Sequence, residues 1–265
     1  MTCKKFLPAL TYPVIDPVLV SIGPISIHWY GVAYVAGVLL GNGLAVKLSS
    51  SIQLNVNVND WVTNVILGII LGGRLGYVCF YDPNYYLSNP AKIMAIWEGG
   101  MAFHGGAIGA FLATIYTCKK ANVSIHKGLD ILAICATPGL FFGRVANFIN
   151  AELVGRPTSH PFGMVFPGAG DVPRHPSQLY EAGLEGLLLF VILYWLIQRH
   201  YSEGRIFSTF VIGYGMIRFF IEFTRAPDAH LGLLAGQLSM GQWLSIVMII
   251  AGGAWTYGRH KHILH

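Results

Sequence analysis

Three arginines lie within apolar stretches that approach the length needed to cross a lipid bilayer. Arg74 lies in NVILGIILGGRLGYVCFY, Arg144 in TPGLFFGRVANFIN and Arg218 in FVIGYGMIRFFIEF. An arginine at the middle of a bilayer costs about 2.5–3.5 kcal/mol on insertion scales, and its guanidinium stays protonated. Each side chain must therefore face a carboxylate, a water-filled cavity or an anionic ligand. Because lipid phosphate is the anion most available in a bilayer, the pattern predicts a protein that handles phospholipid head groups.

The composition also indicates a membrane protein. Hydrophobic residues make up 54% and charged residues 11% of the 265 residues, with a mean hydropathy of +0.56, whereas soluble domains carry about 25% charged residues. A helix needs about 20 apolar residues to cross a bilayer. Seven runs qualify as candidates, at about 27–47, 62–81, 101–118, 129–149, 179–198, 206–223 and 240–257. The sequence therefore predicts an all-α, polytopic membrane protein forming a single domain over residues 1–265, with about seven transmembrane helices around a central cavity.

Two segments between these runs lack a long helical pattern. The region at about 150–177 contains GRPTSHPFGMVFPGAGDVPRHPS, whose glycines and prolines are typical of a loop. The segment DPNYYLSNPAKIMAIWEGG mixes aromatic and turn residues and predicts short interfacial helices. Basic residues gather in CKKANVSIHK and in the tail GRHKHILH. This bias predicts a cytoplasmic C-terminus, an N-terminus outside and a small extracytoplasmic loop region at 150–177.

The net charge and the cysteines narrow the class of partner. The charge of +5 is dispersed, so attraction to a membrane surface explains its sign and no nucleic acid is expected as a partner. The four cysteines have no metal-ligand spacing. We interpret them as inert thiols, and the sequence predicts no metal site.

The densest polar cluster runs from Gly143 to Arg156. Arg144 and Asn147 are three residues apart and share a helical face, which Asn150 continues. The planar fork of an arginine suits phosphate oxygens, and asparagine adds neutral donors. The alternative is a structural ion pair between Arg144 and Glu152. The cluster holds more donors than one such pair needs, which favours an anion site.

A second cluster, Phe103-His104-Gly105-Gly106, lies near the start of a predicted span. A neutral imidazole can accept a proton near physiological pH, and paired glycines allow close approach of a backbone or a lipid. A hydrogen-bonding role for His104 without catalysis is equally open. If both substrates are lipid-like, they must enter sideways through a gap between spans, and Gly105 and Gly106 are candidates for its lining.

The third cluster is a stripe at spacings of four, four and three residues on one helical face. Its members are Tyr214, Arg218, Glu222 and Arg225. Such a stripe could bind a head-group phosphate. The alternative is that Arg218 and Glu222 satisfy each other.

Two other functional classes compete with a lipid-handling enzyme. A transporter for an anionic solute would show inverted repeats with paired broken helices, and we find none in the sequence. An assembly protein would use its arginines only for ion pairs, with Glu98, Glu152, Glu181 and Glu222 as the available carboxylates.

Taken together, these clusters resemble the prolipoprotein diacylglyceryl transferase family of bacteria. The matching segments are HWYG at 28–31, LGGRLGYVCFY at 71–81, WEGGMAFHGG at 97–106, GRVANFINAELVGR at 143–156, RHPSQLYEAGLEG at 174–186, GYGMIRFFIEFTRAPDAHLG at 213–232 and SMGQWLS at 239–245. The resemblance implies a seven-span enzyme of the bacterial inner membrane. Such an enzyme moves the diacylglyceryl group of phosphatidylglycerol to the lipobox cysteine of a preprolipoprotein, forms a thioether and releases glycerol phosphate.

The resemblance also implies roles for individual residues. Arg144 and Arg218 are the leading essential residues, supported by Tyr30, His104, Asn147, Glu152, Gly155 and Tyr214. Further supporting residues are Arg74, Asn150, Arg156, Glu222, Arg225, Gly105 and Gly106.

A mechanism follows as a hypothesis from the charges that the reaction develops. Arg144, with Asn147, would hold the phosphate as it leaves, and Arg218 would lower the pKa of the incoming thiol, which is ordinarily about 8.5. His104 would be the general base, or a positioning residue if the cationic field alone ionises the thiol. No cofactor or metal is expected, because arginine supplies the positive charge.

Overall fold

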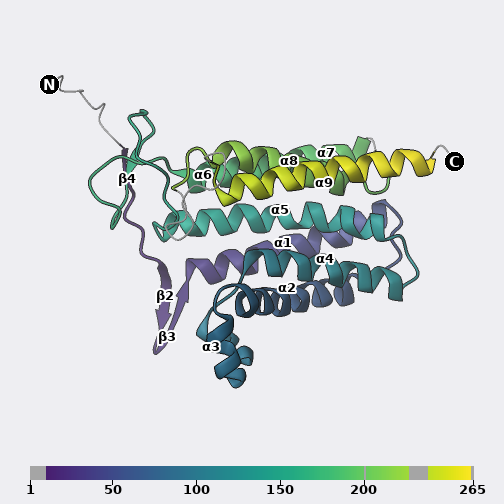
Figure 1. Ribbon diagram of the computed structural model, residues 1–265, viewed down its shortest axis with the longest axis horizontal. Coiled ribbons are helices and arrows are strands. Elements are labelled where there is room, and N and C mark those ends of the chain that lie inside the picture. Colours follow the sequence, from purple (N-terminus) through teal and green to yellow (C-terminus); the bar gives the residue numbers. More distant parts are fainter. Residues whose placement is uncertain (1–9, 200, 227–237, 264–265) are drawn as a thin grey trace. The chain divides into compact units, whose positions relative to one another are not determined.

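The computed structural model describes residues 10–199, 201–226 and 238–263 (Figure 1). Cys3 and the PDAHLG part of the motif, from 227 to 232, lie outside the described residues. The side chains of the basic tail from 259 onward also lie outside them. The chain divides into two compact units, residues 42–133 in unit 2 and the remainder in unit 1. The single-domain expectation stays a prediction.

Four helical segments are long and apolar enough to cross a membrane, judged by length and composition. They are α1 (Trp29–Ser51), α2 (Val58–Phe80), α5 (Ile125–Ile149) and the continuous helix Ser177–Arg199. Three other helices coincide with the remaining predicted spans but do not belong to this set: α4 (Phe103–Lys120), α8 (Arg205–Ile221) and α9 (Met240–Ile263). The protein is therefore mostly helical with four candidate membrane spans among the described residues, and the number of seven spans around a central cavity stays a prediction.

Within unit 2, α2 and α4 pack through glycines. The crossing pairs Gly68 with Gly109 and Gly72 with Gly105, and a Cβ atom on Gly68 would lie only 2.5 Å from the Gly109 carbonyl oxygen. The small-residue spacing seen in the sequence thus brings two backbones into direct contact. Helix α2 begins after Asn57, whose side chain accepts hydrogen bonds from the backbone amides of residues 59 and 60.

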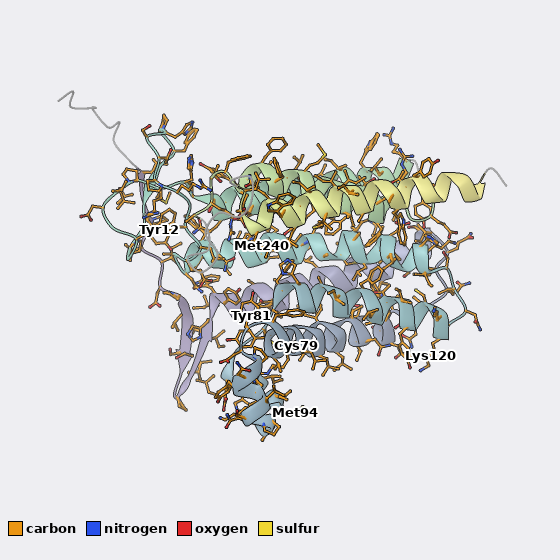
Figure 2. All side chains as sticks on the ribbon, in the orientation of Figure 1. Tyr12, Cys79, Tyr81, Met94, Lys120 and Met240 are labelled. Carbon is orange, nitrogen blue, oxygen red and sulfur yellow. The ribbon has the colours of Figure 1, made fainter. Side chains whose placement is uncertain are left out.

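Short helices follow α2 where the sequence predicts them. They are α3 (Pro83–Ser88), η1 (Pro90–Met94) and η2 (Ile96–Glu98). Several of their apolar side chains are exposed, including Leu87, Met94 and Trp97; Figure 2 labels Met94 at this end of the unit. Exposed aromatic and aliphatic side chains are typical of a membrane interface. They favour an interfacial position for this segment, which stays a prediction.

Two strand pairs depart from the all-α prediction. Strands β2 (Val18–Ile22) and β3 (Ile25–His28) form an antiparallel hairpin directly before α1. Gly23 in its turn has φ +60, a conformation that favours glycine. Strand β1 (Leu10–Thr11) pairs in parallel with β4 (Met164–Val165). The β-branched residues of the hairpin favour strands.

A small core in unit 1 fixes the end of α5. It is formed by Tyr12, Phe148, Met164 and Phe166. The Tyr12 hydroxyl lies 2.8 and 2.7 Å from the carbonyl oxygens of residues 148 and 149, so it can satisfy acceptors that a helix C-terminus leaves open. Tyr12, which Figure 2 labels, and the loop at 150–177 therefore both hold the helix that carries Arg144.

Candidate functional site

Six charged side chains meet inside unit 1. Arg144 comes from α5, Glu181 from α6 (Ser177–Glu181), Glu185 from η3 (Ala182–Leu188), Arg218 from α8, and Glu222 and Arg225 from the residues that follow α8. We call these six residues the arginine–glutamate cluster. It joins side chains that lie as far apart as 144 and 225 in the sequence, so only the tertiary fold can assemble it.

Glu181 is the centre of this cluster. Its carboxylate oxygen Oε2 lies 2.8 Å from Arg144 Nε and 3.0 Å from Arg218 Nη1, and Oε1 lies 3.0 Å from Arg225 Nη1. The Glu181 side chain is fully buried. One buried carboxylate thus contacts three guanidinium groups, and such charge-assisted contacts are among the stronger hydrogen bonds in proteins.

The cluster contains the Arg218–Glu222 pair, which the sequence pattern gives as an alternative to an anion site. Arg218 Nη2 lies 2.9 Å from Glu222 Oε2, and Arg225 Nε lies 3.5 Å from the same oxygen. Ser239 donates a hydrogen bond to Glu222 Oε1 at 3.1 Å. A Cβ atom on Gly241 would lie 2.8 Å from the Glu222 carboxyl carbon, so a glycine at 241 leaves room for this carboxylate.

The other predicted alternative is wrong. Arg144 pairs with Glu181 rather than with Glu152. Asn147 instead bridges Arg144 and Glu152. Its Oδ1 accepts a hydrogen bond from Arg144 Nη1 at 3.4 Å, and its Nδ2 donates one to Glu152 Oε1 at 2.6 Å. The backbone bends sharply beside Glu152, because Ala151 has φ 52 and Leu153 φ 55. Left-handed backbone at two non-glycine residues is uncommon and concentrates at functional sites.

Exposure within the cluster is unequal. Arg144 and Arg218 keep 19% and 15% of their side chains exposed, whereas Glu181 and Glu185 are fully buried. A ligand that reaches the cluster therefore meets guanidinium groups before it meets carboxylates. The two arginines predicted as the leading essential residues provide that accessible positive charge.

A π-helical segment presents Glu185 to the arginines. Segment η3 runs from Ala182 to Leu188, between α6 and α7 (Leu189–Arg199). Such wide turns insert an extra residue into a helix and often occur at functional sites. Beside Glu185, Gly186 packs on Phe141 of α5, where an added Cβ would lie 2.7 Å from the Phe141 Cα. This close approach brings the two helices that carry Arg144 and Glu185 together.

Gly155 and Arg156 belong to a backbone crossing rather than to the charged contacts. The Gly155 amide donates to the His175 carbonyl at 3.0 Å, and the Arg156 amide donates to the Thr224 carbonyl at 2.8 Å. Arg156 Nε donates to the Arg225 carbonyl at 2.6 Å. A Cβ atom on Gly155 would lie 2.5 Å from the carbonyl oxygen of His175. This crossing anchors the backbone of Arg225, which belongs to the cluster.

Two histidines lie in the loop beside this crossing. The ring centroids of His160 and His175 are 6.5 Å apart, and His175 Nδ1 lies 3.4 Å from the Tyr180 hydroxyl. Burial lowers the pKa of His175, and the neighbouring His160 lowers it further. Both effects favour the neutral imidazole.

The predicted tyrosines and Asn150 take different positions. Tyr214 is buried in α8 against the ring of Phe210, and Tyr30 packs on the ring of Tyr34 near the start of α1. Tyr34 interacts electrostatically with Glu152 and Arg144, so the start of α1 belongs to the surroundings of the cluster. Asn150 is half-buried one turn beyond Ala146, whose carbonyl accepts its amide.

Arg74 has a different environment from the other two arginines that the sequence places within predicted spans. It lies in unit 2, is only 4% exposed, and donates to backbone carbonyls: Nε to Ile93 at 2.9 Å, Nη2 to Lys92 at 2.6 Å, and Nη1 to Gly99 and Gly100. Its guanidinium carbon also lies 5.1 Å from the Tyr86 ring centroid. The expectation of a carboxylate, cavity or anion is therefore wrong for Arg74, because backbone carbonyls satisfy its donors.

The second predicted cluster also lies in unit 2. His104 is exposed in the first turn of α4 and contacts the ring of Phe103. Gly105 packs directly on Gly72 of α2, and Gly106 packs on Ile69. These contacts contradict the expectation that the two glycines line a gap for lipid, because the backbone of α2 fills the space beside them.

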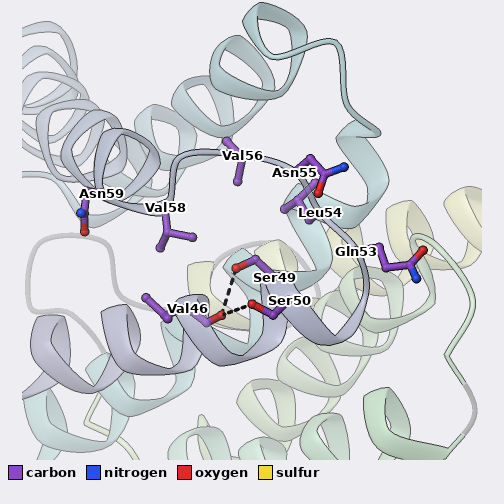
Figure 3. Close-up of a pocket in the computed structure, with 9 residues that line it drawn as sticks. All are labelled: Val46, Ser49, Ser50, Gln53, Leu54, Asn55, Val56, Val58 and Asn59. Atoms are coloured by element: carbon purple, nitrogen blue, oxygen red, sulfur yellow. Dashed lines mark hydrogen bonds between the residues drawn. The ribbon is translucent and has the colours of Figure 1, made fainter.

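A separate hollow of about 450 Å³ lies at the junction of α1 and α2 (Figure 3). Its walls are formed by Val46, Ser49, Ser50, Gln53, Leu54, Asn55, Val56, Val58 and Asn59. None of these residues is charged, and none belongs to the predicted site. The hollow therefore offers no charged group that would bind a phosphate strongly. The arginine–glutamate cluster remains the candidate functional site.

Two carboxylates central to the cluster were missed as site residues. The sequence patterns indicate Glu181 only as a pairing partner in an assembly protein, and they assign Glu185 no role. Their spacing of four residues within the apolar run at 179–198 was a usable signal, because intramembrane carboxylates are rare and usually functional. Tyr34 gave no comparable signal in the sequence.

Comparison with known proteins indicates the same protein family as the sequence motifs do. The sequence profile described as prolipoprotein diacylglyceryl transferase matches residues 17–257. Relatives named phosphatidylglycerol–prolipoprotein diacylglyceryl transferase include those of Bordetella parapertussis (50% identity, covering 92% of this chain and 95% of the relative), Rhodospirillum rubrum (49%, 92% and 92%) and Geobacter sulfurreducens (47%, 92% and 95%). The chain therefore belongs to the prolipoprotein diacylglyceryl transferase family.

Proposed function

We propose that this protein transfers the diacylglyceryl group of phosphatidylglycerol to the thiol of a lipobox cysteine in a preprolipoprotein, the first step of bacterial lipoprotein maturation. The observation that carries the proposal is the match to transferases at about half identity over nearly the whole chain. The arginine–glutamate cluster supports it, because accessible guanidinium groups in an apolar helical unit suit a lipid phosphate.

The reaction joins sulfur to carbon and breaks the bond from that carbon to a phosphate oxygen. Negative charge therefore grows on the leaving glycerol phosphate, and preorganised cations stabilise it. Arg144 and Arg218 approach Glu181 from two helices, and both keep part of the side chain exposed. Asn147, hydrogen-bonded to Arg144, adds a neutral group beside the same guanidinium. An incoming phosphate must compete with resident carboxylates, so binding involves an exchange of partners.

The thiol must lose its proton before or during attack. The field of Arg218 favours the thiolate, and Tyr214 lies on the same helix one turn away. His104 is the candidate base, or a positioning residue if the field suffices. Its exposure at the start of α4 leaves the imidazole accessible, and the Ala102 amide donates to the Gly73 carbonyl at 2.9 Å, which fixes this helix start.

The proposal includes a location and a topology. The protein lies in the bacterial inner membrane with about seven spans around a central cavity, its N-terminus outside and its C-terminus in the cytoplasm. The loop region at 150–177 faces the extracytoplasmic side, where preprolipoprotein substrates present their cysteine. The variants Gly168→Cys and Asn122→Cys test this orientation with a membrane-impermeant thiol reagent: the cysteine at 168 should react in intact cells and the cysteine at 122 should not.

The direct test is reconstitution. The full chain in vesicles with phosphatidylglycerol and a lipobox peptide should produce a thioether-linked diacylglyceryl peptide and one glycerol phosphate per product. A peptide with serine in place of cysteine is the control. Absence of the thioether from a folded preparation would refute the function, and movement of an anionic solute without it would favour a transporter.

Three variants test the assigned roles. Arg144→Lys and Arg218→Lys keep the charge but lose the planar fork, so both should lower turnover by at least about tenfold. Full activity in both would exclude a bidentate phosphate clamp. His104→Gln should slow turnover and alter its pH profile if the imidazole is the base; near-normal turnover would assign His104 a positioning role.

A further inference from the structure

Glu185 is the least compensated carboxylate of the arginine–glutamate cluster. Its side chain is fully buried, and neither carboxylate oxygen has a hydrogen-bond partner among the described residues. The nearest cationic atoms, Arg218 Nη1 and Arg144 Nε, lie 3.6 and 4.0 Å away. By contrast, Glu181 accepts hydrogen bonds at 3.0 Å from two arginines. A buried carboxylate without donors is unfavourable in its charged form, so Glu185 is the member of the cluster best suited to take up a proton.

The charges of the cluster cancel in the absence of a ligand. Three guanidinium groups and three carboxylates give a net charge of zero. The ionisable groups that act on Glu185 from the surrounding elements are Arg144, Glu181, Tyr214, Arg218 and Arg225. Helix α7, which continues from η3, contributes ionisable groups only at Tyr194 and Arg199. Arg199 is exposed at the end of α7, about four helical turns beyond Glu185, so it does not balance an additional negative charge at the cluster.

A bound anionic lipid would disturb this balance. A phosphodiester with an uncharged glycerol head adds one negative charge to a neutral, poorly hydrated cluster, where like charges interact more strongly than in water. One proton on Glu185 restores neutrality. It also removes the repulsion between Glu185 and a phosphate held by Arg144 and Arg218.

We propose that Glu185 takes up one proton when the phosphate of a net-anionic phospholipid binds to the arginine–glutamate cluster. The inference rests on the proposed function for the identity of the ligand. The proton comes from solvent and forms an O–H bond on the Glu185 carboxylate, no bond of the lipid breaks in this step, and the proton returns when the anionic product leaves. Glu185 is then a positioning residue that couples lipid binding to net charge, since an anionic lipid binds together with one proton and a zwitterionic lipid needs no compensating proton.

Calorimetry measures this proton directly. Short-chain dihexanoyl phosphatidylglycerol is titrated into the full chain in neutral detergent, at one pH in two buffers that differ in ionisation enthalpy. The wild type should take up close to one proton per lipid, and its Kd should rise by up to about tenfold per pH unit where the free carboxylate is ionised. Dihexanoyl phosphatidylcholine, whose head group is zwitterionic, should bind without proton uptake.

Two variants locate the proton. Glu185→Gln should bind phosphatidylglycerol without proton uptake and with an affinity that no longer depends on pH. Glu203→Gln changes an exposed carboxylate outside the cluster and should behave as the wild type does. Wild-type binding without proton uptake, or equal uptake by Glu185→Gln, would overturn the assignment.

A second measurement uses the wild type alone, so it tests the proposal even if the Glu185→Gln variant does not fold. Infrared difference spectra of the wild type with isotope-labelled glutamate should gain the carbonyl band of a protonated carboxylic acid when the lipid is added. Absence of that band would overturn the proposal. Thioether formation without proton uptake refutes only the role of Glu185, whereas a folded protein that neither binds the lipid nor forms the thioether also refutes the proposed function.

Discussion

Replacing Glu181 with glutamine tests whether the arginine–glutamate cluster is held by its central carboxylate. The change keeps the shape of the side chain but removes its charge and one acceptor oxygen. Arg144, Arg218 and Arg225 each lose a charge partner that lies 2.8–3.0 Å away. The net charge of the cluster then rises from zero to +1 inside a buried site. Breaking one buried ion pair typically costs about 3–5 kcal/mol, so we expect Glu181→Gln to lower the free energy of unfolding by at least that amount.

A compensating change separates charge balance from lost packing. Arg225 contacts Glu181 through Nη1, so Arg225→Met removes one guanidinium and returns the Glu181→Gln cluster to neutrality. Residues in direct contact commonly show coupling energies of about 0.5–3 kcal/mol. We therefore expect the double variant to lose at least about 1.5 kcal/mol less stability than the sum of the two single variants.

The assay is equilibrium unfolding in mixed detergent micelles with increasing denaturing detergent, followed by tryptophan fluorescence. Glu98→Gln is the matched control, because Glu98 pairs with Lys92 on the exposed surface of unit 2 and solvent screens such pairs. A Glu181→Gln variant as stable as the control would refute the reasoning. Strict additivity in the double variant would show that charge balance does not link the two residues.

Three further predictions concern the scaffold around the site. Gly109→Val should destabilise unit 2 by about 1–3 kcal/mol or more, because the valine side chain would overlap the backbone of Gly68. The control is Gly43→Ala, where nothing lies within 4 Å of an added Cβ atom, and it should change stability by less than about 1 kcal/mol. Titration with a denaturing detergent compares the two variants. Tyr12→Phe leaves two α5 carbonyls without the tyrosine hydroxyl and should cost about 1 kcal/mol in the same titration; an unchanged midpoint would contradict this capping role. The pKa of His175 is lowered by burial and by His160, so the unfolded state binds more protons and the stability of the loop should fall as the pH drops through about 6.5. Amide exchange of residues 156–175 should therefore rise at acid pH after correction for intrinsic rates, and His160→Ala should reduce that rise; an equal rise in both would exclude the histidine pair as its cause.

The sequence identifies helices well where a single physical constraint dominates. Long apolar runs predict α1, α2, α5 and the helix Ser177–Arg199 to within a few residues at most ends, because a bilayer leaves few alternatives to a helix of that length. The spacing of Gly68 and Gly72 predicts close helix packing, and the structure supplies the partner glycines on α4. The hairpin before α1 was missed, because it is short and its apolar residues resemble the start of a span.

The charged site is harder to predict because pairing depends on the tertiary fold. The sequence places Arg218 and Glu222 on one helical face, and that pair is present at 2.9 Å. Nothing in the local spacing shows that Arg144 and Arg225 share Glu181, since these residues come from three separate elements. Arg74 illustrates the converse error: a mid-span arginine is expected to face a carboxylate, a water-filled cavity or an anionic ligand, yet backbone carbonyls of the segment 92–100 accept its hydrogen bonds. Backbone acceptors carry no residue-type signal, so the sequence could not reveal them.

The neutral cluster changes how the arginines would act in the proposed reaction. If the guanidinium groups were unpaired, they would bind a monoanionic lipid tightly, and tight ground-state binding does not accelerate chemistry. Competition from Glu181 and Glu222 weakens that ground-state binding. The leaving glycerol phosphate develops a charge of about −1.5 to −2, so it competes with the carboxylates more effectively than the intact lipid does. The arginines then favour the transition state over the substrate, and the same carboxylates help to displace the product once the carbon–oxygen bond has broken.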